Sequence, residues 1–360
     1  MSSDFPRTFS ILQSGIEQGL HLGAQWCISL NGHIVCDEAV GQSRHGVPMQ
    51  PDSVVHWLSA GKPITAVAIA QLWERGMLNL DDPVAVHIPE FGVRGKDRVT
   101  VRHLLTHTAG FRAFGLRRDQ PVEQALLEIY AMTLEPNWIP GQKAGYHALS
   151  SWYVLGELIA RVTGSSFHAY LREQIFKPAT MTRTSIGLTP ADIETLGSQL
   201  AFVYDTSAHP PATSYTGASH AELVTASPGS NTRGPARDLV CFYHAFLTGK
   251  LVSNTTREAM AARHRVGLSD RTFGQPIDFG LGFLINSSHY NPATPHPYNY
   301  GPHASARTFG HSGSQSSCAF VDPEQTLIVA WHCNGTPGEP RHQVRQTQIN
   351  EAIYLDLGMA

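Results

Sequence analysis

The spacing of apolar residues predicts helices at both ends of the chain and one strongly apolar helix near its start. Phe9, Leu12 and Ile16 recur at helical spacing and predict an amphipathic helix over residues 5–22. A strongly apolar helix is predicted from Ser59 to about Gly76. Further helices are predicted over residues 149–162, with Gly164 as the C-terminal cap, over residues 237–247 and over residues 339–357.

Short apolar runs bounded by turn residues predict strands near both ends of the chain. Asn31-Gly32 is a two-residue hairpin signal between the runs 25–30 and 33–36. Counting outward from this turn places Cys27 opposite Cys36, where the two thiols are either buried separately or joined in a disulfide. Later strands are predicted over residues 280–285, 316–321 and 326–331, with a turn at Asp322-Pro323 between the last two.

This order of elements predicts an α+β fold. Strands from both chain ends would form one antiparallel sheet flanked by helices, with a mostly helical domain inserted between its halves. We expect residues 1–80 and 224–360 to form the sheet-containing α/β domain, and residues 81–223 to form the inserted helical domain.

Composition narrows the possible partners and locations. The chain has 360 residues, of which 42% are hydrophobic and 15% charged, so it can bury a large core. Its net charge of −3 gives no electrostatic reason to expect nucleic acid or an anionic membrane as partner. The N-terminal segment has no apolar run long enough for a signal peptide, and no run reaches the roughly 20 residues of a membrane span. A cytoplasmic location is therefore expected, and the oligomeric state is open.

Neither a metal nor a cofactor is expected. The chain has 19 histidines, but it has no HExxH motif and no histidine or cysteine pair with a third ligand at a suitable spacing. It has no glycine-rich phosphate-binding loop. The five cysteines are an odd number spread over a long chain, so they imply no disulfide framework.

Candidate chemistry begins at Ser59-Ala60-Gly61-Lys62. Residues three apart on a helix lie on one face, so the Ser59 hydroxyl and the Lys62 amine can meet. A buried amine can take the hydroxyl proton and make the oxygen a good nucleophile, and the N–H groups of a helix start can bind an oxyanion. The alternative is structural, with Ser59 capping the helix and Lys62 solvated.

Four segments in order resemble the serine β-lactamase and penicillin-binding-protein superfamily, specifically its class C-like branch with family VIII carboxylesterases. Ser59-Ala60-Gly61-Lys62 matches the SxxK motif of that family, and residues 103–110 resemble its LLTHTSG segment. Residues 140–159 resemble the stretch that carries the catalytic tyrosine, and Gly310-His311-Ser312-Gly313 resembles the HxG form of the third motif on an edge strand. The resemblance covers residues 10–335 and implies a β-lactamase/transpeptidase-like fold.

The resemblance also implies catalytic roles. Ser59 would attack a carbonyl and form an acyl-enzyme, with a partly neutral Lys62 as its base. Tyr146 would relay a proton to the leaving group, because a phenol near an ammonium is a stronger acid than a free phenol. The backbone N–H groups of Ser59 and Ser314 would form the oxyanion hole.

Neighbouring residues receive different expectations. His311, Ser312 and Gly313 would line the substrate site beside Ser314, whereas His107 is expected to be structural. Trp57 and Phe309 either shape an acyl pocket or belong to the core. The segment 286–308 is rich in Pro, Asn, His and Tyr, and we expect it to overhang the pocket and help to select substrate.

Two departures from the family pattern bear on the substrate. The second motif is Tyr146-His147-Ala148, so the amide of the class C Tyr-x-Asn motif is missing. The third motif has His311 where β-lactamases have lysine, which weakens a fixed positive charge for a substrate carboxylate. Arg307 is a candidate to replace that charge. Both departures resemble family VIII esterases and acyltransferases more than true β-lactamases.

The sequence therefore predicts a serine hydrolase that cleaves a small ester or amide. Acyl transfer to an alcohol or amine is an alternative, because the two reactions differ only in whether the pocket excludes water and holds an acceptor. A β-lactamase or a D-amino-acid peptidase or amidase is another alternative. A non-catalytic ligand-binding relative is the fourth reading, and the intact set of Ser59, Lys62 and Tyr146 argues against it.

Overall fold

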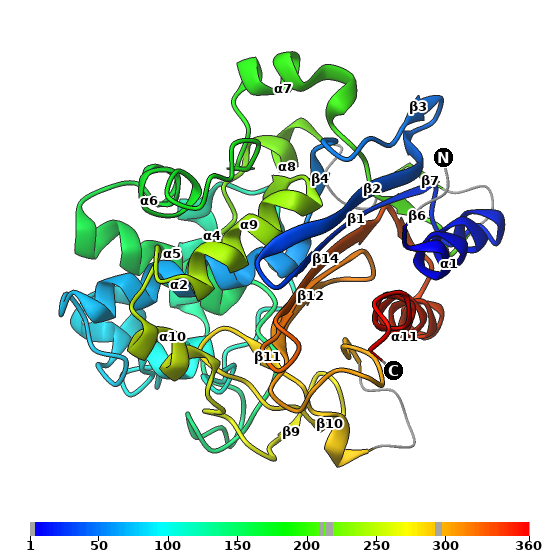
Figure 1. Ribbon diagram of the computed structural model, residues 1–360. Helices are drawn as coiled ribbons and strands as arrows, with labels where there is room; N and C mark the ends of the chain where they lie inside the picture. Colours follow the sequence, from blue (N-terminus) through cyan, green and yellow to red (C-terminus); the bar gives the residue numbers. More distant parts are fainter. Residues whose placement is uncertain (1–3, 209–211, 214–218, 292–296, 360) are drawn as a thin grey trace.

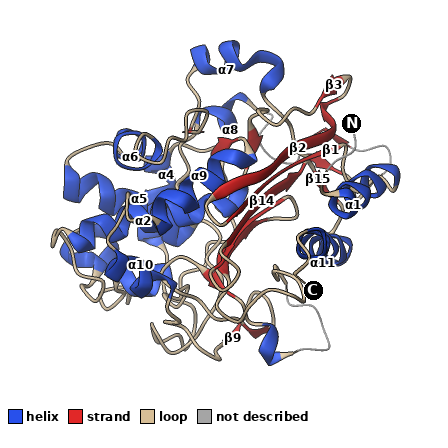
Figure 2. Ribbon diagram, in the orientation of Figure 1, coloured by secondary structure: helices blue, strands red, loops and turns tan. Residues whose placement is uncertain are grey.

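Both ends of the chain contribute strands to one central sheet in the computed structural model, which describes residues 4–208, 212–213, 219–291 and 297–359 (Figure 1). The strands are β1 (Gly23–Leu30), β2 (His33–Arg44), β3 (Val47–Pro48), β11 (Leu284–Ile285), β12 (Phe309–Gly313), β13 (Ser317–Asp322) and β14 (Leu327–Cys333). They lie in the order β11-β12-β13-β14-β1-β2-β3, and every neighbouring pair is antiparallel (Figure 2). The predicted α+β architecture is confirmed.

Helices cover both faces of the sheet. Helices α1 (Pro6–Glu17) and α11 (Glu339–Asp356) lie on one face, and α9 (Ala236–Leu247) lies on the other, with α2 (Lys62–Glu74) beyond it (Figure 1). Side chains of β14 alternate between the two faces, as the geometry of a strand requires. Val329 and Trp331 pack with Ile353 of α11, whereas Ile328 and Ala330 belong to the core that contains α2 and α9.

The middle of the chain is mostly helical, as predicted. It contains α3 (Val101–Leu105), α4 (Val122–Ala131), α5 (Ser150–Thr163), α6 (Phe167–Leu171), the π-helical turn η4 (Arg172–Phe176), α7 (Pro190–Leu196) and α8 (His220–Val224). Gly164 has a φ of +68° and caps α5 in the left-handed conformation expected of a C-cap. Residues of α5 share the core of α2.

Short strands connect this helical region to the rest of the protein. β4 (Val55–His56) and β5 (Ser185–Ile186) both pair with β8 (Thr232–Gly234), and β6 (Tyr204–Asp205) pairs with β7 (Ala212–Thr213) and β15 (Gly335–Thr336). Helix α10 (Asn254–Ala261) and the β9 (Ser269–Asp270) and β10 (Gln275–Pro276) hairpin follow α9. The division at residues 80 and 224 stays a prediction.

Two local predictions were wrong. A β-bulge between Ile28 and Ser29 shifts the register of the first hairpin, so Cys36 lies opposite Ile28 and Cys27 opposite Asp37. Both thiols are free, and they belong to the cores on opposite faces of the sheet. The strand predicted over residues 280–285 pairs only at Leu284–Ile285, because the chain turns at Gly282, whose φ is +78°.

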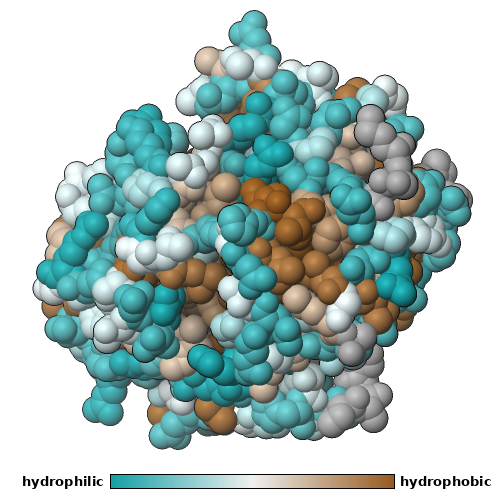
Figure 3. Space-filling view, in the orientation of Figure 1, coloured by the Kyte–Doolittle hydropathy of each residue, from teal (hydrophilic) through white to brown (hydrophobic). Residues whose placement is uncertain are grey.

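The space-filling view shows one face of the molecule (Figure 3). In the orientation of Figure 1, this face is largely hydrophilic, with apolar residues gathered near its middle (Figure 3). None of the helices in the described ranges is long and apolar enough to cross a membrane.

The turn that carries Ser59 is held against the sheet by close backbone contacts. This 3-10 turn, η1 (Leu58–Gly61), follows Trp57, whose carbonyl accepts a 2.6 Å hydrogen bond from the Ser317 hydroxyl of β13. A Cβ atom on Gly313 would lie 2.2 Å from the same carbonyl, so only glycine allows β12 to approach the turn this closely. Leu58 has a φ of +51°, which costs on the order of 1–3 kcal/mol and must be offset by the surrounding packing.

We expect Gly313→Ala to destabilise the protein by about 1–3 kcal/mol, the usual cost of overpacking, and to displace η1. Thermal unfolding monitored by circular dichroism measures the effect on stability. Gly115→Ala is the matched control, since a Cβ there meets nothing within 4 Å. Equal unfolding midpoints for the two variants would contradict this account of the contact.

Candidate active site

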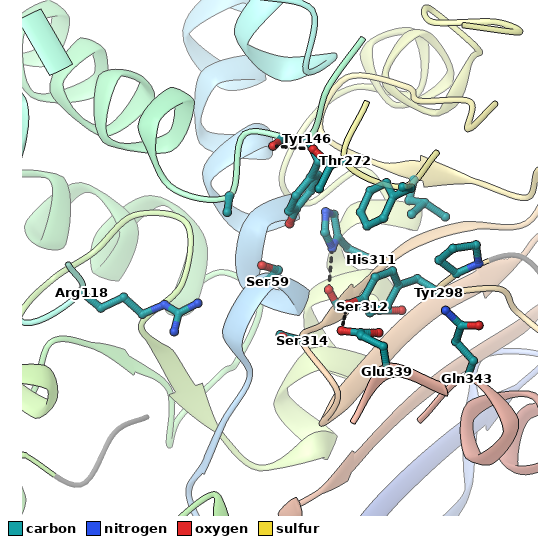
Figure 4. A pocket seen from close by; sticks show the side chains of 14 residues that line it. Ser59, Arg118, Tyr146, Thr272, Tyr298, His311, Ser312, Ser314, Glu339 and Gln343 are labelled. Carbon is teal, nitrogen blue, oxygen red and sulfur yellow. Dashed lines mark hydrogen bonds between the residues drawn. The ribbon is translucent and has the colours of Figure 1, made fainter. Parts of the chain in front are cut away.

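Three sequence-distant segments meet at a cavity of about 380 Å³ beside the C-terminal end of β12 (Figure 4). Ser59 and Tyr146 lie at its inner wall, and His311, Ser312 and Ser314 come from β12 and the turn after it. The remaining lining residues are Arg118, Ala148, Thr272, Phe273, Leu284, Pro297, Tyr298, Glu339 and Gln343.

Ser59 and Lys62 are in direct contact. The Lys62 amine lies 2.9 Å from the Ser59 hydroxyl oxygen. The predicted α-helix begins only at Lys62, and Ser59 sits in the preceding 3-10 turn. This difference brings the pair closer, because side chains three residues apart eclipse one another in a 3-10 helix.

Lys62 is fully buried and has polar partners on every side of its amine. Besides Ser59, the amine donates to the carbonyls of Ala148 at 2.8 Å and Gly229 at 2.6 Å. No carboxylate pairs with Lys62 among the described residues, and desolvation, followed by the charge of Arg118, lowers the pKa of Lys62 well below its usual range. A neutral amine keeps both bonds to carbonyls and uses its lone pair to accept the Ser59 proton.

Tyr146 completes this set. Its ring centroid lies 5.5 Å from the Lys62 amine, and a side-chain hydrogen bond links the phenol to Ser59. The expectation of a more acidic phenol was wrong. Desolvation outweighs the hydrogen bond to Ser59 and raises the pKa of Tyr146, so the phenol stays protonated at neutral pH.

A buried ion pair anchors the backbone of Tyr146. The carboxylate of Asp270 accepts a 3.1 Å hydrogen bond from the Tyr146 N–H and lies 3.0 Å from the guanidinium of Arg265. Arg265 also donates to the carbonyl of Thr106 at 3.2 Å. Sequence reasoning missed Arg265 and Asp270, because they lie far downstream in a segment with no local motif.

The two histidines behind Tyr146 are structural. The ring of His107 packs on that of Tyr146 at 4.5 Å, and its Nδ1 accepts the N–H of His147 at 2.9 Å. Nε2 of His147 accepts the N–H groups of Gly110 and Phe111, which places its proton on Nδ1. Burial lowers the pKa of His147 to about 3. The structure therefore agrees with the expected packing role of His107.

The β12 residues form the opposite wall. Nδ1 of His311 bonds to the carbonyl of Ser312 at 2.8 Å, its Nε2 has no partner within the described structure, and its ring centroid lies 6.0 Å from that of Tyr146. Desolvation, with a smaller effect of Lys62, lowers the pKa of His311 to about 3, so the ring is neutral. Gly313 lies behind this wall, against Trp57. β12 is second in the sheet, but β11 pairs only with Phe309 and Gly310, which leaves the His311–Gly313 edge facing the site.

Some residues predicted near the site lie elsewhere. Trp57 and Phe309 are buried members of the hydrophobic core, and neither lines the cavity. Arg307 lines a separate cavity beside Phe309 and Pro323, so it does not supply a positive charge to this one.

The segment 286–308 does reach the cavity. Pro297 and Tyr298 line it, and the Tyr298 hydroxyl donates to Glu339 at 3.0 Å. Residues 292–296 of that segment lie outside the described residues, as do residues 1–3 of the N-terminal segment. The influence of the segment 286–308 on substrate choice stays a prediction.

The part of the chain that the structure describes contains no group of three His, Cys, Asp or Glu side chains arranged to hold a metal ion. The groups that lie in or next to the cavity wall include the Ser59 hydroxyl, the Tyr146 phenol and the Lys62 amine that contacts Ser59.

Comparison with known proteins places this arrangement in a known context. The profile of the family described as Beta-lactamase matches residues 10–354. The chain is 29% identical over 345 residues to the esterase/beta-lactamase LipL of Mycobacterium tuberculosis (strain ATCC 25618 / H37Rv), covering 86% of this chain and 76% of that protein.

Solved structures give the same result for the fold. A family VIII carboxylesterase is similar with a TM-score of 0.78 and 25% identity, covering 98% of this chain and 97% of that one. A penicillin-binding protein homologue from Caulobacter crescentus is similar with a TM-score of 0.78 and 26% identity, again covering 98% and 97%. The resemblance seen in the motifs is confirmed.

We expect Asp270→Asn to destabilise the protein by roughly 3 kcal/mol, because it leaves the buried Arg265 guanidinium without its counter-charge. Urea denaturation followed by tryptophan fluorescence measures the change. Asp119→Asn removes the partner of an exposed arginine, Arg117, and should leave the denaturation midpoint unchanged. If Asp270→Asn were no more harmful than Asp119→Asn, the anchoring role of this ion pair would be refuted.

Proposed function

The chain belongs to the beta-lactamase family, and we propose that it is a carboxylesterase-like serine hydrolase that cleaves a small ester or amide through an acyl-enzyme on Ser59. One observation carries this proposal. The Ser59 hydroxyl lies 2.9 Å from a buried lysine amine that has no carboxylate partner within the described structure, at the wall of a substrate-sized cavity.

Acylation starts with proton transfer from the Ser59 hydroxyl to the neutral Lys62 amine. The Ser59 oxygen attacks the substrate carbonyl carbon, and the carbonyl oxygen becomes an oxyanion. The backbone N–H groups of Ser59 and Ser314 are the proposed oxyanion hole, since both residues line the cavity on the side of η1 and β12.

Collapse of the intermediate breaks the bond to the leaving group. The protonated phenol of Tyr146 gives its proton to the departing oxygen or nitrogen and is reprotonated by the Lys62 ammonium. Its raised pKa suits this role, because the phenol holds its proton until a strongly basic leaving group develops. In deacylation, water attacks the acyl carbon, its proton passes to the Tyr146–Lys62 pair, and Ser59 regains a proton as it leaves.

Two features favour an ester or simple amide over a β-lactam. Ala148 offers its carbonyl to Lys62 and has no side-chain amide to bind the acylamide group of a β-lactam. His311 is neutral, so the third motif lacks the fixed positive charge that a lysine gives it in β-lactamases.

Other readings remain as alternatives. Acyl transfer uses the same acyl-enzyme and differs only in the acceptor, and a β-lactamase or D-amino-acid peptidase or amidase would use the same nucleophile. The contact between Ser59 and Lys62 argues against a non-catalytic binding role, because it gives the hydroxyl a base at hydrogen-bond distance.

We expect the purified protein to hydrolyse p-nitrophenyl butyrate and to form a covalent butyryl adduct visible by intact-mass spectrometry. Ser59→Ala should reduce turnover by at least about 1000-fold and abolish the adduct, because no nucleophile remains. Nitrocefin should be turned over slowly or not at all.

The matched control is Ser317→Ala, a serine that bonds to Trp57 beneath the same turn and should still form the adduct. Rapid nitrocefin hydrolysis would contradict the esterase preference. An adduct that persists in Ser59→Ala would contradict the assignment of the nucleophile.

A further inference from the structure

Arg118 lies in the loop between α3 and α4 and extends into the cavity toward Ser59 (Figure 4). The residues on either side of Arg118 in the sequence form an ion pair, in which Arg117 donates two hydrogen bonds, of 2.8 and 2.6 Å, to the Asp119 carboxylate. That pairing occupies the carboxylate of Asp119, which follows Arg118 in the sequence.

The guanidinium of Arg118 has no counter-charge within the described residues. No carboxylate lies within ion-pair distance of it, and its Nε atom is buried without a hydrogen-bond partner. A guanidinium that lines a cavity and forms no ion pair within the described residues is suited to binding an anionic group of a ligand.

Arg118 is the permanently charged cation among the described residues that line the cavity. His311 is neutral, and burial holds Lys62 toward its neutral form. Glu339 lines the opposite wall, where its carboxylate accepts a hydrogen bond from the Tyr298 hydroxyl (Figure 4). A substrate anion would therefore be attracted to the Arg118 end and repelled from the Glu339 end, with Ser59 between them.

We propose that Arg118 is a specificity-determining residue that binds a carboxylate of the substrate, so that the preferred substrates are esters or amides carrying a negative charge. This inference rests on the proposed hydrolase function and names the substrate class for the same site. Arg118 would then supply the positive charge of the site from outside the third motif, in which His311 stands where the family pattern has a lysine.

The experiment compares charged and neutral isosteres. In the first pair, mono-p-nitrophenyl glutarate carries a carboxylate on its acyl group and p-nitrophenyl valerate does not. In the second pair, the acetyl ester of p-hydroxybenzoate carries a carboxylate on its leaving group and the acetyl ester of p-hydroxybenzamide does not. The measured quantity is the ratio of kcat/KM for the charged ester to that for its neutral isostere. Comparing this ratio between variants removes differences in intrinsic ester reactivity.

We expect Arg118→Gln to lower this ratio by about 10-fold or more in at least one pair, the size expected for loss of a charge-assisted hydrogen bond. Arg118→Lys should restore part of the ratio, because it keeps the charge without the bidentate fork. Arg172→Gln, which changes an exposed arginine that does not line the cavity, should leave the ratio unchanged.

Whichever pair responds identifies the side of the scissile bond that carries the carboxylate. A ratio that changes by less than about twofold in both pairs for Arg118→Gln, or that falls equally in Arg172→Gln, would overturn the proposal. If the wild-type protein hydrolysed none of the four esters, the proposed function itself would fail. Hydrolysis of the neutral esters with an unaltered ratio would refute only the role of Arg118.

Discussion

A lysine amine buried without a carboxylate partner in the described structure is the constraint on which the site depends. Desolvation lowers the pKa of Lys62, and two backbone carbonyls hold the amine while its third direction faces Ser59. A carboxylate in the same place would stabilise the ammonium and remove the base. Burial thus allows the Lys62 amine to act as a base, because it keeps water and carboxylates away from the amine.

The fold produces this environment by bringing three distant segments together. η1 is pinned to β13 by the Ser317–Trp57 hydrogen bond, and Gly313 lets β12 approach the same turn. The carbonyl partners of Lys62 come from the Tyr146 segment and from the loop before β8. The sheet formed by the two chain ends and the helical region between them each supply part of the site.

Motifs with local spacing could be predicted from the sequence, whereas features set by tertiary contacts could not. The i, i+3 spacing of Ser59 and Lys62 and the alternating strands near the C-terminus led to the correct fold and the correct cluster. The hairpin register failed because a bulge leaves no composition signal, and the acidity of Tyr146 failed because desolvation depends on the whole site. Arg118 and Asp270 have no motif, and only the structure shows where they lie.

The most direct test of the central claim is the titration of Lys62 in the resting protein. The chain has only five lysines, so 13Cε-labelled lysine gives a simple NMR spectrum, and Lys62→Arg identifies the resonance. We predict that Lys62 loses its proton well below the roughly 10.4 of a free lysine, because desolvation disfavours its ammonium form. Titration of Lys62 together with the exposed lysines would contradict its role as the base.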